Sequence, residues 1–563
     1  MVLVRALYAL SDSRLCEVPR ERIRHYNIND SIKSVGAVAI AFATLATAAL
    51  ANQETQAQAG VRPNIVFILA DDLGKEWSSA YGAEDIETPE IDRMAKEGLM
   101  LHSAYAMPQC TPTRVSFLTG QLPYNHGWVN HWDVPRWGSG AHFDPEMNNS
   151  LANILRDAGY STAAAGKWQV DDFRVNPGAM DDAGFDDWAM WTGFEAGNAP
   201  SSERYWDPYI HTPEGSKTYE GEFGPDIYTQ YLLDFMEQNK GAGEPFFVYY
   251  AMALPHTPFV TTPDEPDAEG NLAKHKAMTR YIDKLTGKFL DMVREGDFDR
   301  PTLVIFTTDN GTTGIRGTIH GRKVRGGKMR MDEITGTAMP YIAWGPGLVP
   351  GGRESHQITD EADVLPTFAE LAGATIPGGP GREVDGKSIA PFLLGETDET
   401  PREWILSMGE GQASFENGYV VPQVPFRHRV IRDNRWKIWV NHDREVTRLY
   451  DIKNDPFEDE NLINSDDPEA QRALARLQQV LDTMPEQDQA PRYQPMPPQP
   501  WDRHFGWVNQ LADQRLRQDL KQQAGDPADY DLDRDHLRRE LRRRDAYDPE
   551  RFPKRFGPPK GRE

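Results

Sequence analysis

Short apolar runs alternate with amphipathic segments along most of the chain. Residues 64–70, 160–165, 245–253 and 302–308 are apolar runs that predict buried strands, and residues 341–344 form a shorter one. Residues 89–98, 150–158, 277–296 and 363–373 carry apolar positions at helical spacing, and the helix over 150–158 has a serine cap and ends at a glycine. This alternation predicts an α/β fold whose mostly parallel central sheet is covered by helices on both faces.

The pattern changes beyond about residue 400. Residues 427–440 and 447–450 are typical of antiparallel strands, and residues 468–484 of a helix. We therefore expect a main domain over 62–400 and a smaller C-terminal α+β subdomain with an antiparallel sheet over 401–485. Residues 486–563 are rich in proline and glutamine and then in charge, which predicts a tail that is partly packed or disordered.

The N-terminal region reads as an export signal. Residues 35–51 are uncharged and rich in alanine, Lys33 precedes them, and Ala49 and Ala51 fit a signal-peptidase site. The run is shorter than a membrane-spanning helix requires. We expect residues 1–51 to hold a cleaved signal, which predicts a periplasmic or secreted protein without a stable membrane anchor.

Charge and cysteine content narrow the possible functions. The chain has 563 residues and a formal net charge of −25, which argues against nucleic acid as a partner. An anionic substrate would therefore have to be held by local cationic side chains. Of the two cysteines, Cys16 lies before the signal, so the mature protein keeps Cys110 alone and forms no internal disulfide.

Polar motifs follow four of the predicted strands. These motifs are Asp71-Asp72, Gly166-Lys167-Trp168, Pro255-His256-Thr257-Pro258 and Asp309-Asn310-Gly311. Each alone is a common turn sequence, but ligands of open α/β sheets bind at the carboxyl ends of the strands. Three carboxylates and an amide oxygen that converge there predict a hard divalent cation, Ca²⁺ or Mg²⁺, rather than zinc.

The segment Cys110-Thr111-Pro112-Thr113-Arg114 adds a nucleophile. Pro112 suits a first helical turn, and Val115, Phe117 and Leu118 continue an apolar helical face. Cys110 is therefore expected at a helix N-terminus, where free N–H groups attract anions, and the Arg114 guanidinium suits sulfate or phosphate. The segment predicts an anion site that contains a nucleophile.

The pattern Cys-x-Pro-x-Arg, continued by residues 115–120, closely resembles the signature of the type I, formylglycine-dependent sulfatases of the alkaline phosphatase superfamily. The resemblance covers roughly residues 62–455. It implies that a formylglycine-generating or sulfatase-maturing enzyme oxidises Cys110 to formylglycine, whose hydrated aldehyde attacks sulfur. It also implies a calcium ion, with Mg²⁺ possible, whose ligands are Asp71, Asp72, Asp309, Asn310 and the modified Cys110.

The same resemblance assigns the remaining site residues. Arg114 and Lys167 match positions that hold the sulfuryl oxygens, whereas His256 and Lys328 match positions close to the leaving group. One departure stands at Gln169, where the family usually has a histidine that contacts the formylglycine hydroxyls. Glutamine donates a hydrogen bond but cannot shuttle a proton.

A substrate class is suggested by two clusters of residues. The loop over 124–143 carries aromatic and basic side chains that favour sugar stacking, although they could instead pin the loop to the body. Arg322, Lys323 and Arg325 could hold further anionic groups. We expect a sulfated glycan as substrate. The loop residues in question are Trp128, Trp132, Trp137, His126, His131, Arg136 and His142.

Two other functions remain open at this stage. A phosphonate or phosphodiester hydrolase of the same superfamily can share both the fold and the Cys-x-Pro-x-Arg motif. A non-catalytic carbohydrate-binding homologue is suggested only by Gln169.

Overall fold

The computed structural model describes residues 62–129, 141–171, 173, 176–191, 204–331, 334–409, 413–416, 419–422 and 424–495. The predicted export signal and most of the predicted tail lie outside the described residues. So do four of the loop residues named above: His131, Trp132, Arg136 and Trp137.

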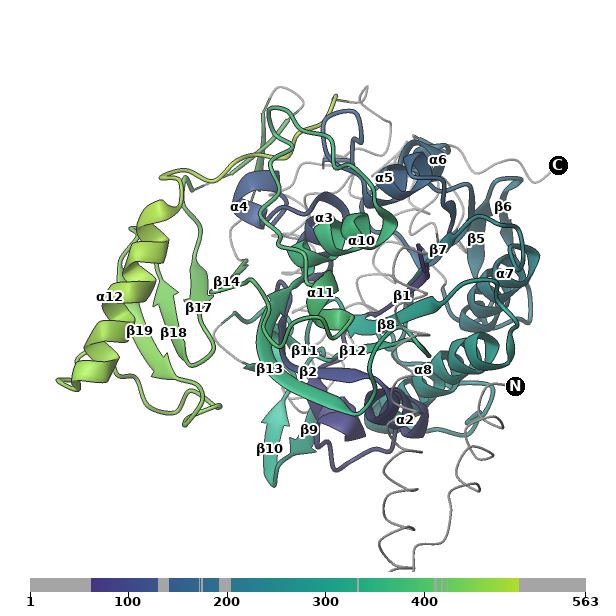
Figure 1. Cartoon of the computed structure of the whole chain (residues 1–563). Coiled ribbons are helices and arrows are strands. Elements are labelled where there is room, and N and C mark those ends of the chain that lie inside the picture. Colours follow the sequence, from purple (N-terminus) through teal and green to yellow (C-terminus); the bar gives the residue numbers. More distant parts are fainter. Residues whose placement is uncertain are drawn as a thin grey trace, which may run out of the picture. The chain divides into compact units, whose positions relative to one another are not determined.

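A large mixed sheet forms the centre of the described chain (Figure 1). Its strand order is β11-β2-β12-β8-β1-β7-β3-β4-β5-β6, with β13 paired to β2. Strands β8, β1, β7, β3 and β4 are parallel neighbours, which confirms the predicted fold class. The bounds are β1 Asn64–Ala70, β2 Leu99–Tyr105, β3 Ser161–Lys167, β4 Asp187–Trp191, β5 Tyr209–Thr212, β6 Gly215–Thr218, β7 Phe246–Ala251, β8 Thr302–Thr308, β11 Ala338–Met339, β12 Tyr341–Trp344 and β13 Arg353–Asp360.

Helices cover both faces of this sheet because its strands are apolar on both sides. Along β1, Ile65, Phe67 and Leu69 pack on one face with α3, α5, α10 and α11, whereas the alternate residues pack on the other face with α2, α7 and α8. The bounds are α2 Pro89–Glu97, α3 Cys110–Thr119, α4 Pro123–His126, α5 Leu151–Asp157, α6 Ala179–Asp182, α7 Gly224–Gln238, α8 Gly270–Glu295, α9 Ile334–Thr337, α10 Val364–Ala372 and α11 Ala390–Leu393, with short 3₁₀ turns η1 Lys75–Trp77, η2 Ser79–Tyr81 and η6 Glu361–Asp363.

A separate antiparallel sheet lies C-terminal to the main sheet, as predicted. Its order is β14-β17-β18-β19, and α12 packs on it through Ala470, Ala473, Leu477 and Leu481 (Figure 1). Two hairpins complete the described strands. The bounds are β9 Arg316–Ile319, β10 Arg322–Arg325, β14 Ile405–Met408, β15 Ala413–Glu416, β16 Tyr419–Pro422, β17 Arg429–Arg432, β18 Trp436–Val440, β19 Val446–Asp451 and α12 Pro468–Thr483.

The first residues beyond 485 pack on the main domain. Tyr493 is buried, and its hydroxyl accepts a hydrogen bond from the Val420 N–H at 2.8 Å. Arg492 donates to the Asn125 carbonyl at 2.7 Å. Within the described ranges, no helix is long and apolar enough to span a bilayer.

Candidate active site

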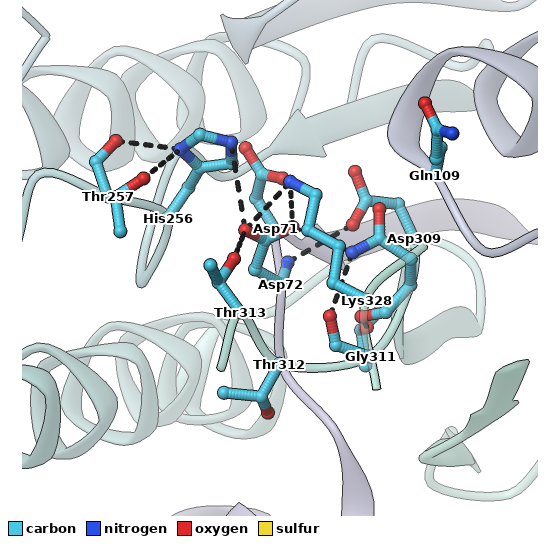
Figure 2. A network of polar contacts seen from close by, with 12 residues as sticks. Asp71, Asp72, Gln109, His256, Thr257, Asp309, Gly311, Thr312, Thr313 and Lys328 are labelled. Carbon is cyan, nitrogen blue, oxygen red and sulfur yellow. Dashed lines mark hydrogen bonds and ion pairs between the residues drawn. The ribbon is translucent and has the colours of Figure 1, made fainter. Parts of the chain in front are cut away.

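The polar motifs predicted from the sequence meet at the carboxyl ends of the parallel strands, and Figure 2 shows Asp72, His256 and Asp309 there. Asp71 follows β1 and Asp309 follows β8, and these parallel neighbours end in register, with Ala70 beside Thr308. Lys167 is the last residue of β3. His256 lies in the loop after β7, which pairs with both β1 and β3. Parallel pairing therefore brings together side chains that lie far apart in the sequence.

Asp71 and Lys167 form a buried ion pair. Lys167 Nζ lies 2.7 Å from Asp71 Oδ2, and each side chain is at most 1% exposed. Burial acts to raise the pKa of Asp71, but the charges of Lys167, Arg114 and Lys328 outweigh it and hold the pKa below its usual value. Asp71 is therefore ionised, and its Oδ1 atom is buried without a hydrogen-bond partner.

Asp72 is the centre of the polar network. Asn310 Nδ2 donates to its Oδ1 at 2.7 Å, and Lys328 Nζ lies 2.6 Å from the same oxygen. The Thr313 hydroxyl donates to Oδ2, and His256 Nε2 lies 3.6 Å from that atom (Figure 2). The backbone of Asp72 is left-handed, with φ 67°, a conformation that often marks functional positions in a non-glycine residue.

Arg114 reaches the site from α3 and holds Asp309. Its Nε and Nη2 atoms lie 3.2 and 2.8 Å from Asp309 Oδ2. Its Nη1 atom donates to the Lys167 carbonyl at 2.8 Å and to the Tyr249 hydroxyl at 3.2 Å. Burial and the charge of Asp71 raise the pKa of Asp309 to about 7, although Arg114 opposes the shift. A bound cation would favour the ionised form of this carboxylate.

Cys110 is the first residue of α3, as predicted, and is 4% exposed. The Thr113 hydroxyl, one turn into the helix, donates to the Asp309 carbonyl at 2.7 Å and so ties α3 to the end of β8. A thiolate at Cys110 would raise the pKa values of Lys328 and Arg114, because both cations lie close to the sulfur. The nucleophile position is thus next to two cations at a helix N-terminus.

His256 is held by its Nδ1 side. Arg204 Nη2 lies 2.8 Å from Nδ1, and the Thr257 carbonyl oxygen lies 2.7 Å from it. Burial and the charges of Lys328, Arg204 and Lys167 lower the pKa of His256 well below its usual value. His256 is therefore a neutral imidazole.

The donor atoms fit a hard divalent cation. Asp71 Oδ1 and Asn310 Oδ1 are both buried and lack hydrogen-bond partners, which is the state expected of oxygen ligands. Asp71, Asp72 and His256 each offer one atom within 4.8 Å of the others. The sequence predicted His256 at this site, close to the leaving group and not as a metal ligand.

The structure also places residues that the sequence analysis missed or left open. Gln169, two residues beyond β3, is 9% exposed and has a left-handed φ of 75°. Thr313 was missed although it lies just beyond Asp309-Asn310-Gly311. Tyr249 was missed because it reads as one more apolar residue of a buried strand, and Arg204 because its segment carries no motif.

One interpretation of the tryptophan loop is corrected. Trp128 was expected to stack on sugar, but it is fully buried in the core with Phe143 and Leu151. Its backbone N–H donates to His126 Nδ1 at 3.0 Å, and His126 is itself fully buried. Apolar packing in the core therefore decides the position of the Trp128 side chain.

Comparison with known proteins agrees with the geometry. The Sulfatase family profile matches residues 63–374, more than half of the chain. The chain belongs to the sulfatase family. A second profile, described as N-sulphoglucosamine sulphohydrolase, C-terminal, matches residues 329–487.

Among curated relatives, N-acetylgalactosamine-6-sulfatase of Canis lupus familiaris is 31% identical over 59% of this chain and 66% of its own length. Arylsulfatase G of Rattus norvegicus is 29% identical over 60% of this chain and 69% of its own length. The chain therefore spans about two thirds of the length of the curated relatives it matches.

Solved structures show the same fold. Ps i-CgsB, known also in complex with k-i-k-neocarrahexaose, gives a TM-score of 0.62 at 23% identity, covering 82% of this chain and 100% of its own. BT4656, solved with its substrate D-glucosamine-2-N,6-O-disulfate, gives a TM-score of 0.55 at 21% identity, covering 75% of this chain and 97% of its own.

Proposed function

We propose that this sulfatase hydrolyses sulfate esters of a glycan, using a nucleophile derived from Cys110 and a divalent cation. The observation that carries the proposal is the convergence of two buried cations, Arg114 and Lys167, and the partly buried Lys328 on one acidic cluster, with Arg114 and Lys328 close to Cys110. Such a set stabilises the negative charge of a sulfuryl group while it is transferred.

The family implies a bound divalent cation and a formylglycine, and this chain has residues that would provide both. Asp71, Asp72, Asp309 and Asn310 would hold Ca²⁺, with Mg²⁺ as the other candidate, and the ion would supply charge stabilisation to the sulfuryl oxygens. Formylglycine made from Cys110 by a maturing enzyme would supply a nucleophile that no unmodified side chain provides.

The chain's own residues have separate tasks. Arg114 is held by Asp309 and the Lys167 carbonyl, so its guanidinium has little freedom to move and stays close to Cys110. Lys167 is fixed by Asp71 in the same way. His256 and Lys328 both lie beside Asp72, where one of them can protonate the leaving oxygen.

One comparison of substrates distinguishes sulfate-ester hydrolysis from the alternative, hydrolysis of phosphonates or phosphodiesters. Sulfate and phosphate monoesters and a phosphodiester of the same phenol should be assayed with protein that was matured in its own host. We expect kcat/KM to be highest for the sulfate ester. A higher value for a phosphate or phosphonate ester would assign the chain to the rival group.

The glycan assignment is supported by the relatives and by one hairpin. Two solved relatives bind sulfated saccharides, and curated relatives are named for a sulfated sugar. In the β9–β10 hairpin, Arg316 pairs with Arg325 in register, and Lys323 lies on the same face. All three are exposed, and the strand leads directly to Lys328. Arg322 is on the other face, where Asp459 pairs with it at 2.7 Å.

A matched pair of lysine variants tests this surface. Lys323→Ala should raise KM for a sulfated oligosaccharide and leave an aryl sulfate unaffected, because only the longer substrate reaches the hairpin. Lys96→Ala on α2 removes the same exposed charge from a helix that carries no proposed site residue. Equal effects of the two variants would show that the hairpin does not bind substrate.

The tryptophans outside the described residues give an independent test of sugar binding. Trp132→Ala or Trp137→Ala should reduce kcat/KM on a sulfated oligosaccharide far more than on an aryl sulfate. Equal losses on both substrates would remove the support that this loop gives to a glycan substrate.

Export to the periplasm or medium also belongs to the proposal, and N-terminal sequencing of the mature protein tests it.

A further inference from the structure

The residue after Lys328 is a methionine at the rim of the candidate active site. Lys328 Nζ lies 2.6 Å from Asp72 Oδ1 (Figure 2), whereas the next side chain, Met329, is 54% exposed and is the most exposed large apolar side chain of the described residues. The Met329 N–H donates to the Pro108 carbonyl at 2.8 Å, two residues before Cys110. Met329 therefore joins the segment that carries the lysine to the segment that carries the nucleophile.

The backbone at Met329 is unfavourable for a methionine. The Arg330 N–H donates to the Gly327 carbonyl at 2.8 Å, so Lys328 and Met329 are the central residues of a turn. The second of them, Met329, has a φ of 70°, a value that suits glycine or asparagine. Among the described non-glycine residues with a left-handed backbone, Met329 is the only apolar one. Stability alone would favour glycine or asparagine at this position.

The turn is held rigidly, so the place of Met329 at the rim is fixed. The Lys328 N–H donates to the Thr312 carbonyl at 3.1 Å, and Thr312 belongs to the loop after β8 that carries two of the proposed metal ligands. A Cβ atom at Gly327 would lie 2.6 Å from the Gly336 nitrogen, so two backbone segments pack here at a distance that only glycine permits. The Met329 side chain thus extends from a backbone that cannot easily move away.

An exposed apolar side chain on a rigid rim beside several cations suits a ligand with two kinds of surface. A sulfated sugar has an anionic group, which the cations would hold, and C–H groups on the faces of its pyranose ring. The thioether side chain is flexible and polarizable, so it adapts to an irregular apolar surface of this kind. A single exposed apolar residue elsewhere on a protein needs no explanation, but at Met329 the strained backbone and the position next to Lys328 both point to function.

We propose that Met329 is a specificity-determining residue that packs on the C–H face of the sugar whose sulfate group lies beside Lys328. This inference rests on the proposed function for the class of substrate. It adds an apolar contact that favours an ester with a sugar ring over inorganic sulfate or a small ester without a ring. A contact that covers about 60 Å² of the side chain corresponds to about a tenfold gain in affinity.

Equilibrium binding to a chain that lacks the nucleophile tests this contact. Cys110→Ala is titrated calorimetrically with sulfated hexasaccharides prepared from carrageenan, chondroitin 6-sulfate and heparin, and the tightest binder becomes the probe. The further substitution Met329→Asn should weaken binding of the probe about tenfold and leave the dissociation constant of inorganic sulfate unchanged. Leu272→Ala on α8 is the matched control, since Leu272 is 48% exposed and lies on a helix without proposed site residues, and it should change neither value.

Thermal unfolding of Met329→Asn separates a substrate contact from a structural role. Asparagine tolerates the left-handed backbone, so the variant should melt at the same temperature as the unsubstituted protein or at a higher one. A lower melting temperature would show that the fold needs the methionine. Unchanged affinity for the probe, or an equal loss in Leu272→Ala, would show that Met329 does not contact the sugar. Each of these results would overturn the inference.

Sulfate release by the unsubstituted, matured protein tests the proposed function separately. If sulfate is released and Met329→Asn leaves the affinity for the hexasaccharide unchanged, only the present inference fails. If no sulfate ester is hydrolysed, the proposed function fails, and the titration of Cys110→Ala still decides whether Met329 contacts a sugar. Absence of binding by all three hexasaccharides would overturn the inference.

Discussion

Two buried aspartates, Asp71 and Asp363, are alike in exposure and differ in how they are satisfied. Each is at most 1% exposed and each pairs with a cation, Lys167 for Asp71 and Arg402 for Asp363. Around Asp363 both carboxylate oxygens are saturated by backbone and side-chain donors from outside η6. These donors include Lys387 N at 2.7 Å, Thr359 Oγ1 at 2.8 Å and Asp360 N at 3.1 Å. At Asp71, Oδ1 has no partner.

Hydrogen-bond saturation distinguishes the structural carboxylate Asp363 from the site carboxylate Asp71. A buried carboxylate without enough donors is costly, so a fold that needs it only for stability surrounds it with N–H and O–H groups, as around Asp363. The unsatisfied oxygens of Asp71 and Asn310 lie in the proposed metal site, where a bound cation would complete them.

The largest effect is expected at the nucleophile. Cys110→Ala should abolish sulfate release and leave the melting temperature nearly unchanged, because the thiol takes part in no structural ion pair. A sulfate-release assay and thermal unfolding measure the two results. Activity above background in this variant would rule out the covalent mechanism.

Asp71→Asn should remove the response to calcium. In the unsubstituted protein, Ca²⁺ at one hundred times its dissociation constant should stabilise the fold by about 2.7 kcal/mol, and EDTA should abolish activity until Ca²⁺ is restored. In the variant, unfolding should be almost independent of Ca²⁺ and kcat/KM about 10²-fold lower. Full activity in a metal-free sample would contradict this.

Asp363→Asn should weaken the fold and leave the calcium response intact, which is the opposite of the result expected for Asp71→Asn. Breaking the buried pair with Arg402 should lower the free energy of unfolding by about 3 kcal/mol. Activity per folded molecule and the rise in melting temperature with Ca²⁺ should remain. Denaturant unfolding with and without Ca²⁺ measures both. Loss of the calcium response in this variant would erase the distinction between the two aspartates.

The smallest effect is expected at Glu76 in η1, which is 1% exposed. Burial raises the pKa of Glu76 to about 7. Since the unfolded chain releases this proton first, stability is lost as the pH rises from about 4.5 to about 7 and changes no further above that. Glu76→Gln should therefore match the unsubstituted protein near pH 4 and exceed it at pH 8 by at most about 3 kcal/mol. An equal difference at both pH values would show that the effect is not the carboxyl charge.

The sequence predicted the main sheet and most of the site because both depend on local patterns. Residues 64–70, 302–308 and 341–344 coincide with β1, β8 and β12, and Cys110 begins α3 as predicted. In contrast, β2 was missed because it follows α2 with only Gly98 between them, and α8 begins seven residues before the predicted start at 277. Local periodicity does not show where packing extends or ends an element.

The contacts that organise the site were beyond sequence reasoning. Arg204 meets His256 only because β4 and β7 lie on either side of β3 in the sheet. Trp128 was assigned to a sugar surface from its loop composition, and its burial depends on residues 141–155 that pack over it. The sequence motifs indicated which residues carry the chemistry. The contacts of those residues and their burial could be read only from the folded structure.

The mass of the peptide that contains residue 110 decides whether the protein carries a formylglycine nucleophile. The protein should be purified from its own host, digested and measured without reduction or alkylation. The proposed function predicts an aldehyde, formylglycine, at this position in most of the molecules. An unmodified cysteine thiol in protein that is otherwise correctly folded would contradict it and would favour a carbohydrate-binding protein that keeps the sulfatase fold without its chemistry.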